Sequence, residues 1–328
     1  MDNKSISDMQ AMKNASMNKK RICMYSGCNE LAIKSYVLQK NGILRQISED
    51  NHLIELKTTS LNEVEKKGMF AFKKIGVNDA YTFSGFCARH DSLIFKPIED
   101  ENLVDFYNPL HQSLFAYRGL CQEIRRKEIS IEWIDDASMK LDPFSRIQFI
   151  SLQDGYKLGV KNLSFFKLRI EKTIETEDFG EFIFNTIEMD KIDLCVSVPL
   201  NIDEEEDSNP LNLSYEEWKD NLKFPFSTSF INIFPYKQKS YFIGGYHKDY
   251  PCKWTKNKIN KLNYLKNKKL RKELSDFIVL RLEFWVMSPG LFKKIPPRVM
   301  EKYMQTFSKN IMSHKAKLKT DINLFESI

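Results

Sequence analysis

This sequence is poor in cysteine and has no long apolar stretch, and each absence excludes a class of protein. Six cysteines among 328 residues are too few for a disulfide scaffold. No run of about 18 apolar residues occurs, and the N-terminal residues lack the apolar segment of a signal peptide. We therefore expect a soluble, intracellular, cytoplasmic protein with reduced thiols and no membrane partner.

Several well-known catalytic motifs are also missing. The chain contains no nucleophile elbow, no protein-kinase signature, no His-Glu-x-x-His motif and no Cys-x-x-Cys redox pair. It has no P-loop and no dinucleotide-binding fingerprint, although Gly244 and Gly245 are adjacent near the end of an expected strand. Motif evidence for an enzyme is therefore confined to the region around the first cysteines.

The composition does provide enough apolar material for a large core. Apolar residues make up 42% of the chain and aromatic residues 12%, including 24 phenylalanines. The length fits two domains, or one large domain with an appended module. A formal net charge of +6 allows an anionic partner without requiring one. The chain is also rich in lysine, asparagine and isoleucine, a bias that low-GC genomes produce, so lysine-based arguments carry less weight here.

Four residues have the spacing of metal ligands. Cys23 and Cys28 form a Cys-x4-Cys pair, and after a gap of 58 residues Cys87 and His90 form a Cys-x2-His pair. Three thiolates and one imidazole make a closed, soft, four-ligand set that suits a structural zinc ion better than magnesium or calcium. The remaining cysteines stand apart and are expected to be buried or incidental thiols: Cys121, Cys195 and Cys252.

This spacing resembles that of treble-clef zinc fingers and, more narrowly, of the HNH-type modules of bacterial proteins. The resemblance covers residues 21–100 and implies a zinc knuckle followed by a helix that carries the second ligand pair. In HNH nucleases, a strand after the first pair carries a histidine that acts as general base. The corresponding strand here is 32–37, where Tyr36 occupies that position and no histidine is adjacent. A tyrosine, whose pKa is about 10, is a poor base near neutral pH.

The fold class that we predict is α+β, with three parts. Residues 1–20 are expected to be a disordered tail, because they show no apolar periodicity. Residues 21–100 are expected to form the treble-clef-like zinc module, with a hairpin or loop excursion at 51–83. Residues 101–328 are expected to form a mixed domain with long helices, a small antiparallel sheet and C-terminal helices.

Local signals place the elements of the larger part. Pro109 after Asn108, and Pro143 after Asp142, have the form of helix starts. The second helix is expected to reach about residue 172, with a break near Gly155 or Gly159. Strands are predicted at 179–187 and 192–198, a hairpin at 228–234 and 240–246, and helices along an apolar face at 274–285 and over 297–318. The acidic run 203–207 is expected to be an exposed loop.

Two further groups of charged residues could form functional surfaces. Residues 253–272 contain nine Lys or Arg and no acidic residue, so they could contact nucleic-acid phosphates while an aromatic ring stacks on a base. The candidate nucleic-acid contacts are Lys253, Trp254, Lys256, Lys258, Lys261, Lys266, Lys268, Lys269, Arg271 and Lys272. The alternative is an ordinary solvated helix face. The polar residues of the helix after the zinc module are expected to form an exposed face: Arg118, Glu123, Arg125 and Arg126.

Three functions are compatible with these patterns. The first is a zinc-binding protein that binds nucleic acid or a macromolecular partner; anti-phage defence is a setting suggested by analogy, since degenerate HNH-like modules recur there. The second is a divergent HNH-type nuclease in which another residue, such as His52, replaces the missing base. The third is a protein–protein adaptor in which zinc stabilises the interaction surface. The oligomeric state does not follow from the sequence.

Overall fold

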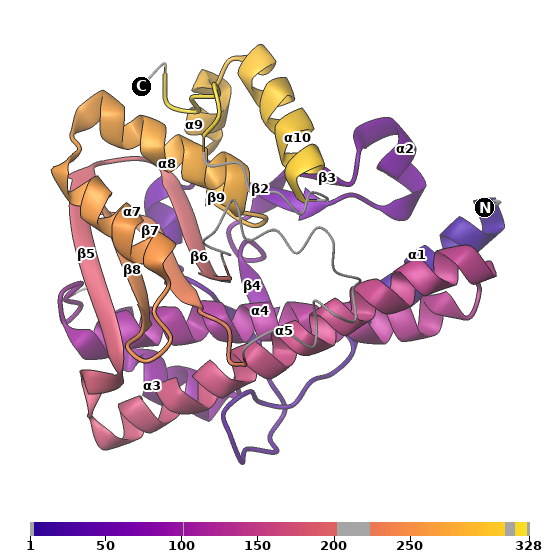
Figure 1. Ribbon diagram of the computed structural model, residues 1–328, viewed down its shortest axis with the longest axis horizontal. Helices are drawn as coiled ribbons and strands as arrows, with labels where there is room; N and C mark the ends of the chain where they lie inside the picture. Colours follow the sequence, from indigo (N-terminus) through magenta and orange to yellow (C-terminus); the bar gives the residue numbers. More distant parts are fainter. Residues whose placement is uncertain (1–2, 101, 202–223, 312–318, 327–328) are drawn as a thin grey trace.

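The computed structural model describes residues 3–100, 102–201, 224–311 and 319–326 (Figure 1). The α-helices are α1 (Asn3–Asn18), α2 (Val64–Lys67), α3 (Ala88–Glu99), α4 (Pro109–Ser138), α5 (Pro143–Thr176), α7 (Lys253–Tyr264), α8 (Asn267–Arg281), α9 (Pro289–Lys294) and α10 (Pro297–Ile311). The strands are β1 (Lys34–Tyr36), β2 (His52–Thr58), β3 (Phe70–Gly76), β4 (Thr82–Ser84), β5 (Phe182–Asp190), β6 (Leu194–Leu200), β7 (Ser229–Tyr236), β8 (Lys239–His247) and β9 (Val286–Met287). Short 3-10 helices cover Leu44–Ile47, Leu61–Glu63 and Phe179–Glu181.

The strands form two antiparallel sheets, as the α+β prediction requires. One has seven strands in the order β3-β2-β9-β6-β7-β8-β5, and the other pairs β1 with β4. Every residue of β7 is buried, which fits a central strand covered on both faces. The expected hairpin at 228–246 is confirmed, and its turn is tighter than predicted. Only Lys237 and Gln238 connect β7 to β8, with Lys237 at a φ of 55°.

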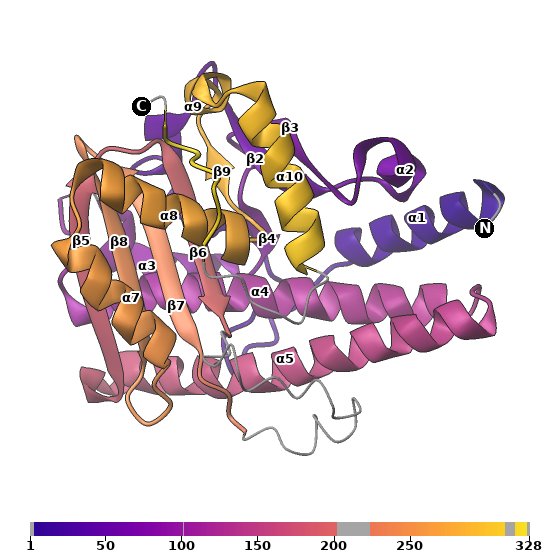
Figure 2. The same ribbon diagram turned by 45° about the horizontal axis from the view of Figure 1, so that its top comes forward.

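The large sheet lies between two layers of helices. Figure 2 shows the long helices α4 and α5 on one side of the sheet and α7 and α8 on the other. Alternate residues of β7 supply the two cores. Phe230 and Phe234 belong to the core shared with α4 and α5, whereas Ile231 and Ile233 belong to the core shared with α7, α8 and α10. The period-two pattern of one buried strand therefore stabilises both layers.

The two long helices begin where the sequence predicted. The side chain of Asn108 accepts a hydrogen bond from the amide of Leu110, and that of Asp142 accepts from the amides of Phe144 and Ser145. The expected break in α5 near Gly155 or Gly159 is absent. At Gly159 an added Cβ would lie 3.0 Å from the Lys127 side chain, so this glycine permits close packing of α4 on α5. Within the described residues, no helix is both long enough and apolar enough to span a membrane.

The N-terminal segment differs from the prediction of a disordered tail. Residues 3–18 form α1, which packs on α4, with Met9 buried and its carbonyl accepting a 3.2 Å hydrogen bond from Trp133 Nε1. The side chain of Gln10 also accepts a hydrogen bond of 2.8 Å from the amide of Leu61. Because these contacts are made with residues far along the chain, local sequence periodicity did not reveal them.

The predicted boundary at residue 100 does not separate two sheets. Strands β2 and β3 form the expected hairpin excursion, and β9 then joins β2 to β6 through the pairs Glu55–Val286 and Cys195–Val286. The hairpin from the N-terminal region therefore extends the main sheet, which is larger than the small sheet expected from sequence. The candidate metal site lies among the cysteine loop, β1, β4 and the start of α3, and side chains of α4 and α5 contact this region.

The C-terminal helices also differ from the prediction in one place. The apolar pattern at 274–285 predicted one helix through Trp285, but α8 ends at Arg281 and Leu282 is extended. Trp285 instead precedes β9, and its carbonyl accepts a hydrogen bond from the amide of Leu56. Strand pairing with β2 is the reason that the helix stops early. The last helix, predicted over 297–318, reaches Ile311, and 312–318 lie outside the described residues, as does the acidic run 203–207.

Candidate metal centre

A tight loop presents the first two candidate ligands. The amide of Cys28 donates to the carbonyl of Tyr25 (3.1 Å), and the amide of Cys23 donates to the carbonyl of Glu30 (2.8 Å). Gly27 adopts a φ of +76°, in the left-handed region that glycine enters without a steric cost. The turn chemistry of this segment therefore brings Cys23 and Cys28 to the same side of the loop.

The start of helix α3 presents the other two candidate ligands, Cys87 and His90. Cys87 is the N-cap residue, and its sulfur accepts a 3.5 Å hydrogen bond from the amide of His90. His90 lies in the first turn of the same helix and is 9% exposed. Next to the β1–β4 pair, the amide of Met24 in the loop donates to the carbonyl of Gly85 (2.9 Å), two residues before Cys87.

The four side chains converge on one point. All their ligand atoms lie within 4.8 Å of one another. His90 Nδ1 is 3.4 Å from Cys23 Sγ and 3.3 Å from Cys87 Sγ. The sulfurs of Cys28 and Cys87 are 3.9 Å apart. In a tetrahedral zinc site a sulfur and a nitrogen ligand would be about 3.5 Å apart and two sulfur ligands about 3.8 Å apart, given Zn–S of about 2.3 Å and Zn–N of about 2.0 Å. The three distances between ligand atoms therefore fit a tetrahedral ion bound through His90 Nδ1.

The predicted ligand set is thus brought together, while the other cysteines lie elsewhere. Among the residues that the structure describes, this cluster is the one set of three or more Cys, His, Asp or Glu side chains close enough to share a metal ion. Cys121, Cys195 and Cys252 are buried, as expected from sequence.

Burial of the cluster keeps the Cys87 thiol protonated until a cation binds. In the absence of a metal, burial raises the pKa of the Cys87 thiol to about 11. A bound cation reverses this effect, because it stabilises the thiolate that coordinates it. If a tetrahedral ion bound here, these four side chains would fill all of its coordination positions, as in structural rather than catalytic zinc sites.

Two arginines of α4 attach this region to the rest of the protein. Arg125 donates to the carbonyls of Ser84 (2.9 Å) and Ile22 (2.8 Å), on either side of the metal cluster. Arg118 is 1% exposed, pairs with Glu99 at 2.5 Å and lies 4.1 Å from the centre of the Phe95 ring. The prediction of an exposed face was therefore wrong for Arg118 and Arg125, because Arg118 pairs with a carboxylate of the module and Arg125 donates to two of its backbone carbonyls.

The positions that a nuclease would use are dispersed. Tyr36 is on β1, and its hydroxyl donates to the carbonyl of Asn78 (3.3 Å). His52 begins β2 in the other sheet, with Nδ1 2.6 Å from the carbonyl of Asp50. Asp79 pairs with Lys34, and Asp91 lies 3.8 Å from Arg118. None of these residues joins the Cys–His cluster.

The basic segment 253–272 forms α7 and the first turns of α8, and part of its charge is neutralised. Lys258 and Lys261 both pair with Glu273, and Lys272 pairs with Asp276 at 2.5 Å. The pKa of Glu273 is held below its usual value, because Lys258 and Lys261 outweigh the opposing effect of burial. Five lysines of the segment are exposed: Lys256, Lys261, Lys266, Lys268 and Lys269. Lys253 and Trp254 lie in α7, but their side chains are outside the described part of the chain.

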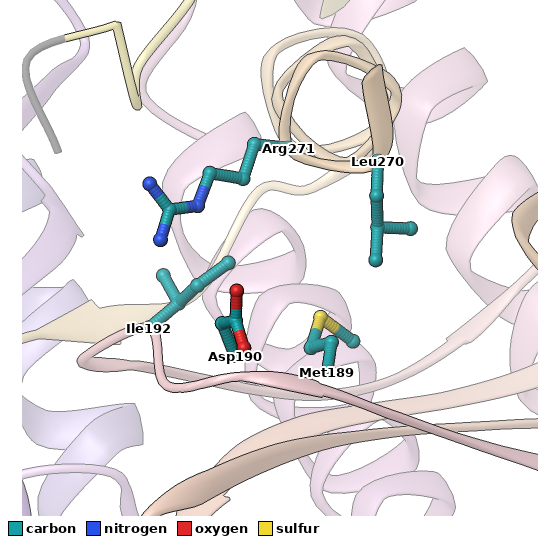
Figure 3. A pocket seen from close by; sticks show the side chains of 5 residues that line it. All are labelled: Met189, Asp190, Ile192, Leu270 and Arg271. Atoms are coloured by element: carbon teal, nitrogen blue, oxygen red, sulfur yellow. The ribbon is translucent and has the colours of Figure 1, made fainter. Parts of the chain in front are cut away.

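Arg271 lies at the edge of this surface and is half-buried. Figure 3 shows its side chain projecting from α8 toward Asp190 and Ile192, beside a cavity of about 10 Å³. The cavity has room for about one water molecule. Arg271 therefore packs over the connection between β5 and β6, which separates it from the exposed lysines.

A larger cleft of about 360 Å³, which the sequence did not reveal, lies between α4, β6 and the segment after α8. Glu123 and Glu283 are two acids that line it, and Glu123 pairs with Arg126 (2.7 Å) and Lys127 (3.1 Å). Although burial opposes ionisation of Glu123, these two cations hold its pKa below the usual value. The only available signal was the helical spacing of Glu123, Arg126 and Lys127, which is equally typical of a solvated face.

Comparison with known proteins adds no further assignment. No protein-family model, curated protein or solved structure matches this chain. The functional argument therefore depends on the geometry of its own residues.

Proposed function

We propose that this protein binds one structural zinc ion through Cys23, Cys28, Cys87 and His90. The observation that carries the proposal is the near-tetrahedral spacing of three sulfurs and one imidazole nitrogen at a buried point. Zinc fits this donor set because it accepts thiolate and imidazole ligands in four-coordinate sites. The order of loop, β1–β4 pair and α3 supports a treble-clef-like module, with the long 37–81 excursion inserted between the two strands.

We propose further that the protein acts by binding nucleic acid through the exposed lysines of α7 and α8. Lys266, Lys268 and Lys269 are close in sequence, exposed, and lie at the connection between the two helices. Lysines at such a surface attract phosphates and release counterions on binding, which makes affinity depend steeply on salt. Anti-phage defence remains a prediction by analogy for the setting of this activity.

Replacing Lys266, Lys268 and Lys269 together by glutamate is expected to weaken DNA binding about tenfold or more. Each lost phosphate contact should also reduce the slope of log affinity against log salt by about 1. Fluorescence anisotropy of a labelled DNA duplex, titrated with the full-length protein at several salt concentrations, measures both quantities. Because the exchanged residues are exposed, the thermal stability of the variant should be close to that of the wild type.

A matched control changes the same net charge at dispersed sites. Lys20, Lys66 and Lys172 are exposed and lie in different parts of the chain, so their joint exchange for glutamate should affect binding much less. Equal loss of affinity in both variants would show attraction by net charge alone. No salt-dependent binding by the wild type would contradict a nucleic-acid partner and favour the adaptor function.

The adaptor function has one structural observation in its favour. The first half of α5 exposes large apolar side chains, namely Phe144, Ile147, Ile150 and Leu152. Exposed apolar residues clustered in this way are typical of protein contact surfaces. A partner bound there would be insensitive to salt, in contrast to one bound at the lysines of α7 and α8.

A further inference from the structure

Three side chains of α5 contact the loop between the first two candidate metal ligands. Lys167, Glu171 and Glu175 are spaced four residues apart, so they lie one above another on one face of the helix. Glu171 accepts hydrogen bonds from the amide (3.3 Å) and the hydroxyl (2.5 Å) of Ser26, and Glu175 accepts one of 2.6 Å from the hydroxyl of Tyr25. Lys167 Nζ donates to the Ser26 hydroxyl oxygen at 2.9 Å.

Glu171 is the centre of this arrangement and is almost fully buried. Its side chain is 5% exposed, and its charge is compensated by Lys167 Nζ at 2.8 Å. The hydroxyl of Tyr117, from α4, donates a further hydrogen bond to the same carboxylate. A buried carboxylate with several donors is fixed in position, since moving it would leave charged and polar groups unpaired.

Fixing Tyr25 and Ser26 in turn orients the ligands on either side of them. The carbonyl of Tyr25 accepts the hydrogen bond from the amide of Cys28, so the loop places that sulfur. The Tyr25 ring lies 4.3 Å from the His90 ring, centre to centre, at an interplanar angle of 33°. Rotation of the imidazole away from the sulfurs would therefore collide with a ring whose hydroxyl is held by Glu175.

We propose that Glu171 is a positioning residue of the metal centre, holding the Cys23–Cys28 loop in ligating geometry from a helix 145 residues further along the chain. The inference rests on the proposed metal site and extends it to a group that touches no ligand atom. Outer groups that orient metal ligands commonly change metal affinity by roughly 10- to 100-fold when replaced. The metal affinity of this protein is then a property of the packed α5 helix as well as of the four ligands.

The test is the zinc affinity of full-length Glu171→Gln, measured by competition with a chromophoric chelator. The amide preserves the shape but loses the charge that Lys167 compensates and presents only one acceptor oxygen. We expect affinity to fall roughly 10- to 100-fold while saturating zinc still gives the wild-type stoichiometry. Ser26→Ala, a mild change at an exposed residue, should weaken binding in the same direction by a smaller factor.

A control substitution on the same helix distinguishes loss of positioning of the Cys23–Cys28 loop from weaker packing of α5 against α4. Gln153 is buried and donates to the carbonyl of Ile131 (3.1 Å) and to Asp135 (2.5 Å), so Gln153→Ala weakens α4–α5 packing without touching the metal loop. Its zinc affinity should equal that of the wild type. The proposal would be overturned if Glu171→Gln and Ser26→Ala both bound zinc as tightly as the wild type. It would also be overturned if Gln153→Ala lost as much zinc affinity as Glu171→Gln. Absence of zinc binding by the wild-type protein would instead contradict the metal site itself.

Discussion

Removal of the metal is expected to unfold the region around α3 and the β1–β4 pair. Structural zinc contributes about 10–16 kcal/mol to the folding of small zinc-finger peptides, whereas the whole stability of a typical protein is about 5–15 kcal/mol. Here the ion would join a loop, two strands of three residues each and the start of a helix. A strong zinc chelator, or the substitution Cys87→Ser, should therefore lower the free energy of unfolding by several kcal/mol.

Thermal unfolding and hydrogen exchange measure this effect. We expect a lower midpoint, and loss of amide protection at residues 22–36 and 82–99 before loss at the central strands β7 and β8. Cys252→Ser is the matched control, since it replaces another buried thiol outside the cluster. Equal stability of the chelator-treated and untreated protein would show that the four side chains need no metal to stay together.

The second large effect is expected from Trp285→Ala. Trp285 is 1% exposed, and its Nε1 donates a 3.1 Å hydrogen bond to the hydroxyl of Tyr303 on α10. Its ring also meets Phe72 of β3 edge-on, at 5.4 Å between centres. Truncation would open a cavity between β3, α8 and α10 and leave the tyrosine hydroxyl without this partner, at a cost of about 3–5 kcal/mol.

Urea unfolding of the variant at equilibrium measures this cost, and zinc content provides an internal control. Trp285 belongs to the core on the α7–α8 side of the sheet, whereas Cys23 and Cys87 belong to the core on the α4–α5 side. The variant should therefore keep its metal while losing stability. A cost below about 1 kcal/mol would contradict close packing of the aromatic cluster around Trp285.

Local signals in the sequence predicted the parts of the fold that local chemistry determines. Proline after an Asn or Asp cap located the starts of α4 and α5, since both features act within one helical turn. Aromatic and β-branched residues on both sides of a short turn located β7 and β8. The Cys–His cluster was predicted for the same reason, because two closely spaced pairs can each face one side of an ion.

What the sequence did not reveal depends on contacts between distant residues. The burial of Arg118 and Arg125 follows from docking against Glu99 and backbone carbonyls, which no helical pattern shows. Likewise β9 has only two residues, and it exists because β2 and β6 flank it. Glu171 gave no signal in the sequence, since its contacts with Ser26 form only when α5 lies against the cysteine loop.

The basic residues of segment 253–272 differ in their surroundings in the fold. Its nine basic residues looked equivalent in the sequence. In the fold, Lys258 and Lys272 pair with carboxylates of α8, and Arg271 turns toward the sheet. The surface available to an anionic partner is therefore smaller than the composition implied, and it is centred on the connection between α7 and α8.

The most direct test of the central claim is the metal content of the purified full-length protein, measured by elemental mass spectrometry alongside Cys87→Ser and Cys252→Ser. We predict about one zinc per chain in the wild type and in Cys252→Ser, and a strong loss of zinc in Cys87→Ser. Of the two substituted cysteines, Cys87 lies in the Cys–His cluster and Cys252 does not. A wild-type protein that contains no zinc and takes up none when zinc is added would contradict the proposed metal centre.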